Sequence, residues 1–207
     1  MTGENNGGAR DLGMGDDAMN LMAGMMLAEM AKWRVKFTID KYVGDWTPEQ
    51  IASGEADAAH YDRYESEGNL LMYGGVSCLW QALIGNGTGT AGQALTYFNN
   101  GNAAIGVGDN NTAAAATQTD LQASSNKLRK AMDASNPVHT DGVVVGAASI
   151  QFKSTFATGD ANWAWEEWGI FNSPTAATGR MLNRKVQSMG TKTSAATWVA
   201  TATITIS

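Results

Sequence analysis

The clearest pattern in the chain is an alternation of apolar and polar residues over residues 33–42. Trp33, Val35, Phe37 and Ile39 fall on one face, and charged or hydroxyl side chains fall between them. Because successive side chains of a strand point to opposite faces, this alternation predicts a strand with one buried side. Residues 197–207 alternate in a similar way and predict a second strand of this kind.

Shorter segments of the same character follow between residues 103 and 186. They predict strands at residues 103–109, 127–133, 144–156, 162–171 and 179–186. The aromatic segment 162–171 is expected to bend at Gly169, and the pair Asn136-Pro137 predicts a turn. Several short strands separated by turns favour a mainly β fold, an antiparallel β-sandwich or jelly-roll-like domain over residues 33–207, rather than an α/β fold.

One or two short helices are expected within this domain. Apolar side chains recur at helical spacing at Val76, Leu79, Trp80, Leu83 and Ile84. They predict an inserted helix at about residues 70–85 that ends at Gly85. Residues 44–67 are polar and acidic, and they predict a loop with one short helix near Pro48.

Residues 1–32 are predicted to form a separate docking segment, in which an arm precedes a Met-rich helix. The first 15 residues are rich in Gly and Asn, and Asp16 and Asp17 suit a helix N-terminus. Methionines then recur at helical spacing, at Met19, Met22, Met26 and Met30, with Met25 beside them. Because methionine is flexible and fills irregular gaps, this helix could dock on a partner or pack on its own domain. The sequence leaves both possibilities open.

Composition and charge exclude several classes of function. Charged residues make up 16% of the chain, the formal net charge is -6, and the Lys and Arg residues are scattered. A nucleic-acid-binding domain usually carries a basic stripe, so no nucleic-acid partner is expected. No apolar segment reaches the ~20 residues that a membrane span needs, so no membrane partner is expected. The polar start lacks the features of a secretory signal, which favours a soluble protein made in a cytoplasm.

The residue types that carry catalysis or bind metals do not form a pattern. His60 and His139 are the two histidines, and both lie in a polar context. The lone cysteine, Cys78, is expected to be a small buried residue. Glu166 and Glu167 are neighbours on a predicted strand, so they point to opposite faces and cannot act as an acid/base pair. The sequence therefore predicts a protein that is not an enzyme and has no cofactor and no metal site.

Seven tryptophans in 207 residues are a high number, and three of them, Trp163, Trp165 and Trp168, lie in the predicted strand 162–171. Tryptophan is enriched both in cores and at interface hot spots. Trp163 and Trp165 fall on one face of that strand, and Trp168 falls on the other unless a bulge at Gly169 re-aims it. We expect two of the three to pack in the core and one to face a subunit. The candidate interface residues are Trp163, Trp165 and Trp168 together with Met19, Met22, Met25 and Met26.

Five segments form a further pattern. They are AIGVGD at 104–109 with 112–113 and 119–121, ANWAWEEWGIFN at 161–172, MLNRKV at 181–186, GTKT at 190–193 and the closing strand that contains Trp198. This pattern resembles that of virion structural proteins of tailed bacteriophages, and the resemblance covers roughly residues 33–207. It implies a structural protein located in the virion, with no catalytic residues to carry over.

Three functions are compatible with this resemblance and with the predicted fold. In the first, the chain is a capsid decoration, or cement, protein that stabilises the shell as a symmetric oligomer, with a trimer favoured. Its partners are then copies of itself and the major capsid protein. In the second, it belongs to a tail fibre, collar or baseplate and binds tail proteins. The third is a carbohydrate-binding β-sandwich in which exposed Trp163 and Trp165 stack on sugars. The short chain lacks the repeats of a fibre shaft, which favours the capsid.

Overall fold

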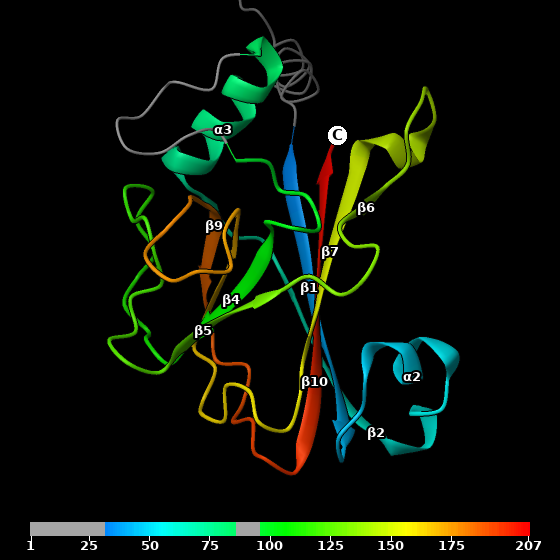
Figure 1. The fold of residues 1–207 in the computed structure, drawn as a ribbon. Helices are drawn as coiled ribbons and strands as arrows, with labels where there is room; N and C mark the ends of the chain where they lie inside the picture. Colours follow the sequence, from blue (N-terminus) through cyan, green and yellow to red (C-terminus); the bar gives the residue numbers. More distant parts are fainter. Residues whose placement is uncertain (1–31, 86–95) are drawn as a thin grey trace, which may run out of the picture. The chain divides into compact units, whose positions relative to one another are not determined.

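Residues 33–207 fold into two antiparallel β-sheets that pack face to face in a computed structural model, which describes residues 32–85 and 96–207 (Figure 1). The prediction of a mainly β sandwich is confirmed. The chain divides into two units, residues 1–32 and residues 33–207, and the account below concerns the second. The predicted arm and Met-rich helix, including Met19, Met22, Met25 and Met26, lie outside the described residues.

The first sheet joins strands from both ends of this domain, in the order β2-β1-β10-β7-β6. Its strands are β1 (Trp33–Val43), β2 (His60–Glu67), β6 (Val138–His139), β7 (Ser149–Phe156) and β10 (Ala196–Ile206). β1 pairs with β10 along its whole length, from Trp33 opposite Ile206 to Val43 opposite Ala196. The alternation predicted for both strands is confirmed, because the apolar positions on their inner faces are buried except at the end where Trp33 pairs with Ile206.

The second sheet has the order β3-β9-β8-β4-β5 and consists of shorter strands. They are β3 (Leu70–Leu71), β4 (Ala104–Gly108), β5 (Lys127–Ala131), β8 (Glu167–Phe171) and β9 (Met181–Val186). Every residue of the two central strands, β4 and β8, is buried. The irregularity predicted at Gly169 lies one residue further on, where the pairing of β8 with β9 shifts between Ile170 and Phe171.

Both predicted helices are present, α2 (Pro48–Ser53) and α3 (Tyr73–Ile84), with two short 3-10 turns, η1 (Asp57–Ala59) and η2 (Val145–Ala148). α3 ends at Gly85, whose φ of 65° is left-handed, as the sequence predicts. α2 begins with a capping box between Thr47 and Gln50. The segment of α2 and η1 packs on the first sheet through a small cluster of its own, in which Ala56 contacts Tyr42 and Val199.

Several segments differ from the sequence-based prediction, among them residues 60–67 and 144–148. Residues 60–67 were expected to form a loop but make the edge strand β2. Most of its side chains are exposed on both faces, so no apolar alternation marks it as a strand. Residues 144–148 were expected to begin a long strand. They form η2 instead, and β7 starts only at Ser149.

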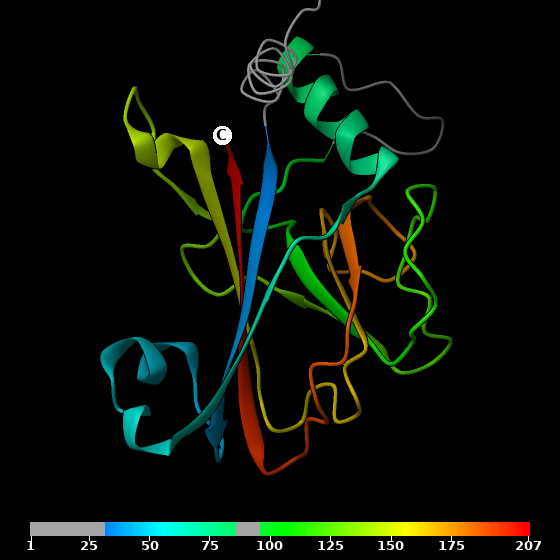
Figure 2. The same ribbon diagram turned by 180° about the vertical axis from the view of Figure 1, so that it is seen from behind.

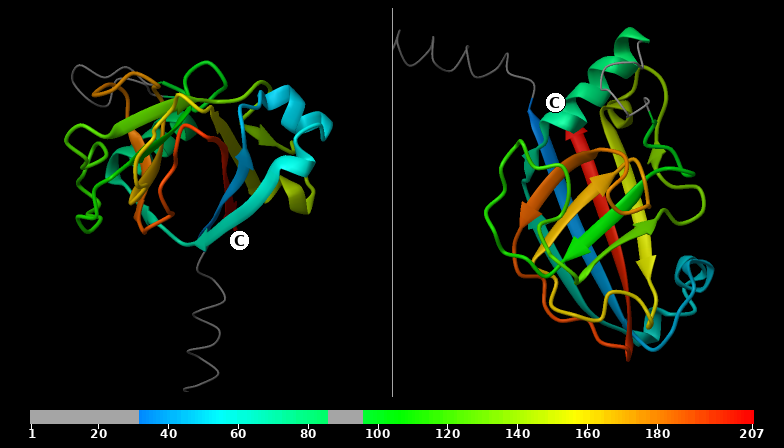
Figure 3. Two further views of the ribbon diagram at one scale, coloured as in Figure 1. Left: turned by 90° about the horizontal axis from the view of Figure 1, so that it is seen from below. Right: turned by 60° about the vertical axis from the view of Figure 1, so that its left-hand side comes forward.

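The two sheets face each other (Figure 3). Aromatic side chains fill the space between them. Phe37 of β1 stacks on Trp168 of β8, with ring centroids 4.0 Å apart and planes 9° from parallel. Trp165 packs edge-on against Phe156 at 4.7 Å and against Trp198 at 4.8 Å. Offset and edge-on ring pairs add to the free energy gained from burial alone, so these contacts hold the sheets together.

The interface role predicted for Trp165 and Trp168 is wrong, because both side chains are fully buried in this core. Residues 162–166 precede β8 and are irregular, since Trp165 bonds through its backbone to Met189 and Gly190. The alternation of side chains along a strand therefore does not place Trp165 and Trp168 on opposite faces. Trp163 packs half-buried against the edge of the core. The expectation that two of the three tryptophans lie in the core is confirmed, and the interface role of Trp163 stays a prediction.

Helix α3 lies against strand β9 at Gly75. A Cβ added at this position would lie 2.5 Å from the Cα of Leu182 and 2.6 Å from its carbonyl oxygen. The helix and strand backbones are thus so close that only glycine, which has no Cβ, fits at this position.

We expect Gly75→Ala to lower the free energy of unfolding by about 1–3 kcal/mol, because the added methyl group forces α3 away from β9. The measurement is urea unfolding followed by circular dichroism. The matched control is Gly74→Ala, where the nearest atom to a new Cβ is 3.8 Å away. That variant should be as stable as the parent or slightly more so. Equal losses of unfolding free energy in the two variants would show that the close approach at Gly75 does not determine the cost of the substitution.

Candidate functional site

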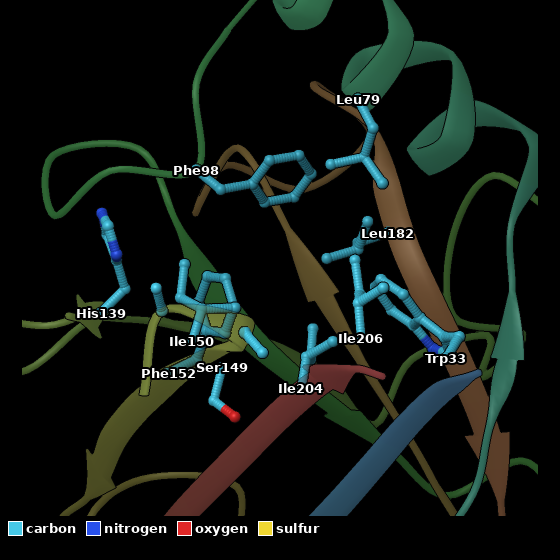
Figure 4. A pocket seen from close by; sticks show the side chains of 12 residues that line it. Trp33, Leu79, Phe98, His139, Ser149, Ile150, Phe152, Leu182, Ile204 and Ile206 are labelled. Carbon is cyan, nitrogen blue, oxygen red and sulfur yellow. The ribbon is translucent and has the colours of Figure 1, made fainter. Parts of the chain in front are cut away.

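An apolar cavity of about 270 Å³ opens at one end of the sandwich (Figure 4). β1 and β10 have 11 residues each, whereas the longest strand of the second sheet has 6. The inner face of the first sheet therefore continues past the second sheet, as Figures 1 and 2 show from opposite sides. Helix α3 lies over this exposed part of the inner face.

The wall of the cavity is almost entirely apolar. The first sheet supplies Trp33, Ile150, Phe152, Ile204 and Ile206. η2 supplies Ala147 and Ala148, and the opposite wall consists of Leu79 from α3, Phe98 from the following loop and Leu182 from β9. Figure 4 shows the side chains of Phe98, Leu79 and Leu182 facing those of Ile150, Ile204 and Ile206 across the opening.

Two of the three polar side chains at the rim already hydrogen-bond within the domain. The indole Nε1 of Trp33 donates to Asn69 Oδ1 at 3.0 Å. The hydroxyl of Ser149 is 2.7 Å from the hydroxyl of Thr205 on the neighbouring strand. His139 of β6 adds an imidazole at one side of the opening (Figure 4). A group bound here would be held mainly by apolar contact.

The apolar surface continues outside the cavity. On α3, Trp80, Leu83 and Ile84 are 60%, 75% and 69% exposed. At the tip where η2 begins, the side chains of Val143 and Val145 are almost completely exposed. Figures 1 and 2 place α3 and this tip at the same end of the domain as the start of β1 and the end of β10. We call the cavity together with these five side chains the apolar end.

This surface was not predicted, although the sequence contains one signal of it. Residues 143–145 are three consecutive valines between Gly142 and Gly146. A run of this kind at a turn is unfavourable in water, so it indicates a contact with another molecule when it is exposed. The sequence-based prediction placed Val144 and Val145 at the start of a strand, with Val144 on its buried face.

A buried ion pair elsewhere in the domain fixes a loop. Arg184 Nε donates to Glu167 Oε2 at 2.7 Å, and both side chains are completely buried. The same carboxylate accepts hydrogen bonds from the backbone N–H groups of Gln122 and Ala123. The pair thereby anchors the connection between β4 and β5, which is a structural role.

A second buried cation, Arg129, holds the loop between β8 and β9. Its guanidinium donates to the carbonyl oxygens of Ser173, Thr175 and Thr178 and lies 3.8 Å from the centre of the Phe171 ring. It also bonds to Asp120 at 2.8 Å, and this bond helps to lower the pKa of that carboxyl group against the opposing effect of burial. The loop is thus fixed by one side chain.

The side chains of Cys78 and Lys192 likewise have structural roles. Cys78 is buried, as expected, and burial raises the pKa of its thiol, which makes it a poor nucleophile. Burial lowers the pKa of Lys192 to about 8, and its amino group donates to Ala157 O and Asn162 Oδ1.

Within residues 32–85 and 96–207, no three His, Cys, Asp or Glu side chains are grouped to hold a metal ion. No helix in this part of the chain is both long and apolar enough to span a membrane.

Comparison with protein-family models, with curated proteins and with solved structures finds no match to this chain. What the site can do is therefore inferred from its geometry. Its apolar lining and the exposed apolar side chains around it suit a docking surface better than a reaction centre.

Proposed function

We propose that the chain is a non-enzymatic structural component of a tailed-phage particle, where it decorates the capsid and stabilises the shell as a symmetric oligomer. The observation that carries the assembly role is the apolar end. Five exposed apolar side chains beside an apolar cavity are costly in water and are typical of surfaces that another protein covers. The phage context is supported by the resemblance of segments between residues 104 and 207 to virion proteins.

The edges of the two sheets favour the apolar end as the assembly surface. Edge strand β2 has the sequence HYDRYESE, and Glu65 on it pairs with Lys36 at 3.2 Å. Edge strand β5 has the sequence KLRKA. The other two edge strands, β3 and β6, are only two residues long. Charged or very short edge strands resist pairing with a strand of another molecule. Association by sheet extension is therefore disfavoured, and the apolar end is the better surface for contact between subunits.

The carbohydrate-binding hypothesis loses its support in this fold. It required Trp163 and Trp165 to be exposed so that both rings could stack on sugars. Trp165 is fully buried and its Nε1 donates to Ala161 O at 2.9 Å. One of the two stacking surfaces is therefore missing, and we do not propose this function.

Localisation on the particle tests the proposed function. Antibodies against the purified chain, applied to particles from a host that produces it, should label the shell at regular positions in immunogold electron microscopy. Particles made without the chain should lose their contents at a lower temperature than complete ones. Label confined to the tail would replace decoration with the tail placement. Particles that carry no label would contradict the structural role itself.

A further inference from the structure

We propose that the cavity of the apolar end receives the Met-rich segment, residues 18–31, of a second copy of this chain. This inference rests on the proposed function, because it identifies the contact that holds the symmetric oligomer together.

The lining of the cavity determines what kind of group it can accept. Ile150, Ile204 and Leu182 present only carbon atoms, and the hydroxyl of Ser149 is occupied by Thr205. A polar or charged group buried here would lose its hydrogen bonds to water without replacement, which is costly. The occupant must therefore be apolar.

Residues 18–31 have the required chemistry. The segment AMNLMAGMMLAEMA contains five methionines and two leucines, and Glu29 is its single charged residue. Met19, Met22 and Met26 recur at the spacing of one helix face. An apolar helix face placed in a groove is a common mode of protein recognition. Methionine suits a cavity with walls from several elements, because its unbranched side chain adapts to an irregular shape.

The place where this segment ends favours a second copy over the segment's own domain. Lys32 alone separates the segment from Trp33, where β1 begins and which itself lines the cavity. A segment that returned to its own cavity would have to reverse direction at this junction. Residues 27–32 contain none of the Gly, Pro, Asn, Asp or Ser residues on which tight turns depend. Exchange with another copy needs no such turn. It closes into a two-fold dimer when it is reciprocal, or into a larger ring when each copy passes its segment to the next.

Disulfide trapping between two full-length variants tests the exchange. One variant carries Met26→Cys and the other carries Ile206→Cys, at a cavity residue that is 52% exposed. Mixed and oxidised, they should form a cross-linked heterodimer at least tenfold faster than Met26→Cys mixed with Val43→Cys. Val43 is a matched control, because it is 59% exposed and lies at the opposite end of the same strand pair. The parent chain, whose Cys78 is buried, provides the background.

A second measurement does not depend on cysteine chemistry. Ile206→Glu places a charge in the cavity and should weaken self-association of the full chain at least tenfold in sedimentation equilibrium. Val43→Glu should leave self-association unchanged.

Three results would overturn the exchange. They are equal cross-linking at Val43→Cys and Ile206→Cys, a monomeric parent chain, and cross-linking only within a chain that carries both Met26→Cys and Ile206→Cys. The proposed function fails separately, since an exchange observed in solution with no label on particles would contradict only the virion role. Shell label without the exchange would contradict only this contact.

Discussion

Arg184→Met should lower the free energy of unfolding by about 3–5 kcal/mol, because it leaves the carboxylate of Glu167 buried without its cation. Both side chains of the pair are completely buried, and their closest atoms are 2.7 Å apart. The backbone N–H groups of Gln122 and Ala123 still stabilise the carboxylate, so the loss should lie within this range and not above it. Urea unfolding at neutral pH, followed by circular dichroism, measures the change.

The matched control for this prediction is Lys36→Met. Lys36 also pairs with a carboxylate, Glu65, at 3.2 Å, but the two side chains are 53% and 47% exposed. Exposed ion pairs contribute at most about 1 kcal/mol, since water solvates both charges when the pair is broken. If the two variants lost equal stability, burial would not determine the strength of the Glu167–Arg184 pair.

Trp168→Ala should lower the free energy of unfolding by about 3–5 kcal/mol, because it opens a cavity in the centre of the core. The indole is fully buried and stacks on Phe37 of the facing sheet at 4.0 Å. The substitution therefore removes a direct contact between the two sheets. Thermal unfolding followed by far-ultraviolet circular dichroism avoids the loss of a fluorescent side chain.

Trp80→Ala serves as the control for this second prediction. Trp80 is 60% exposed on α3, so its removal should change the free energy of unfolding by less than about 0.5 kcal/mol. The comparison should be made at a protein concentration low enough to keep the chain monomeric, because Trp80 belongs to the apolar end. An unchanged melting temperature for Trp168→Ala would mean that the two sheets do not pack as described.

The strands that have one buried face could be predicted from the sequence. In β1, buried Val35, Phe37 and Ile39 alternate with more polar side chains, and this pattern follows directly from the geometry of a strand. The helix α3 could be predicted for a similar reason, and its end at Gly85 follows from the left-handed conformation there. Edge strand β2 could not be predicted, since no face of HYDRYESE is buried throughout.

Features that depend on chain segments meeting in space could not be predicted. Glu167 and Arg184 look like ordinary surface charges in sequence, and only the pairing of β8 with β9 brings them into one buried site. The cavity likewise combines Trp33, Phe98 and Ile206, which are distant in the chain. Trp165 and Trp168 were predicted to point to opposite faces of one continuous strand. The chain is irregular before β8, so the alternation of a strand does not apply there.

The segment of α2 and η1 lies at the opposite end of the domain from α3 (Figures 1 and 2). Ile51 and Ala56, which lie on either side of the exposed turn at Glu55, pack with Tyr42 and Val199 and anchor the segment to the first sheet. Foreign peptides inserted at that turn would project away from the apolar end. The chain could therefore carry antigens or tags at one end while the apolar end stays accessible.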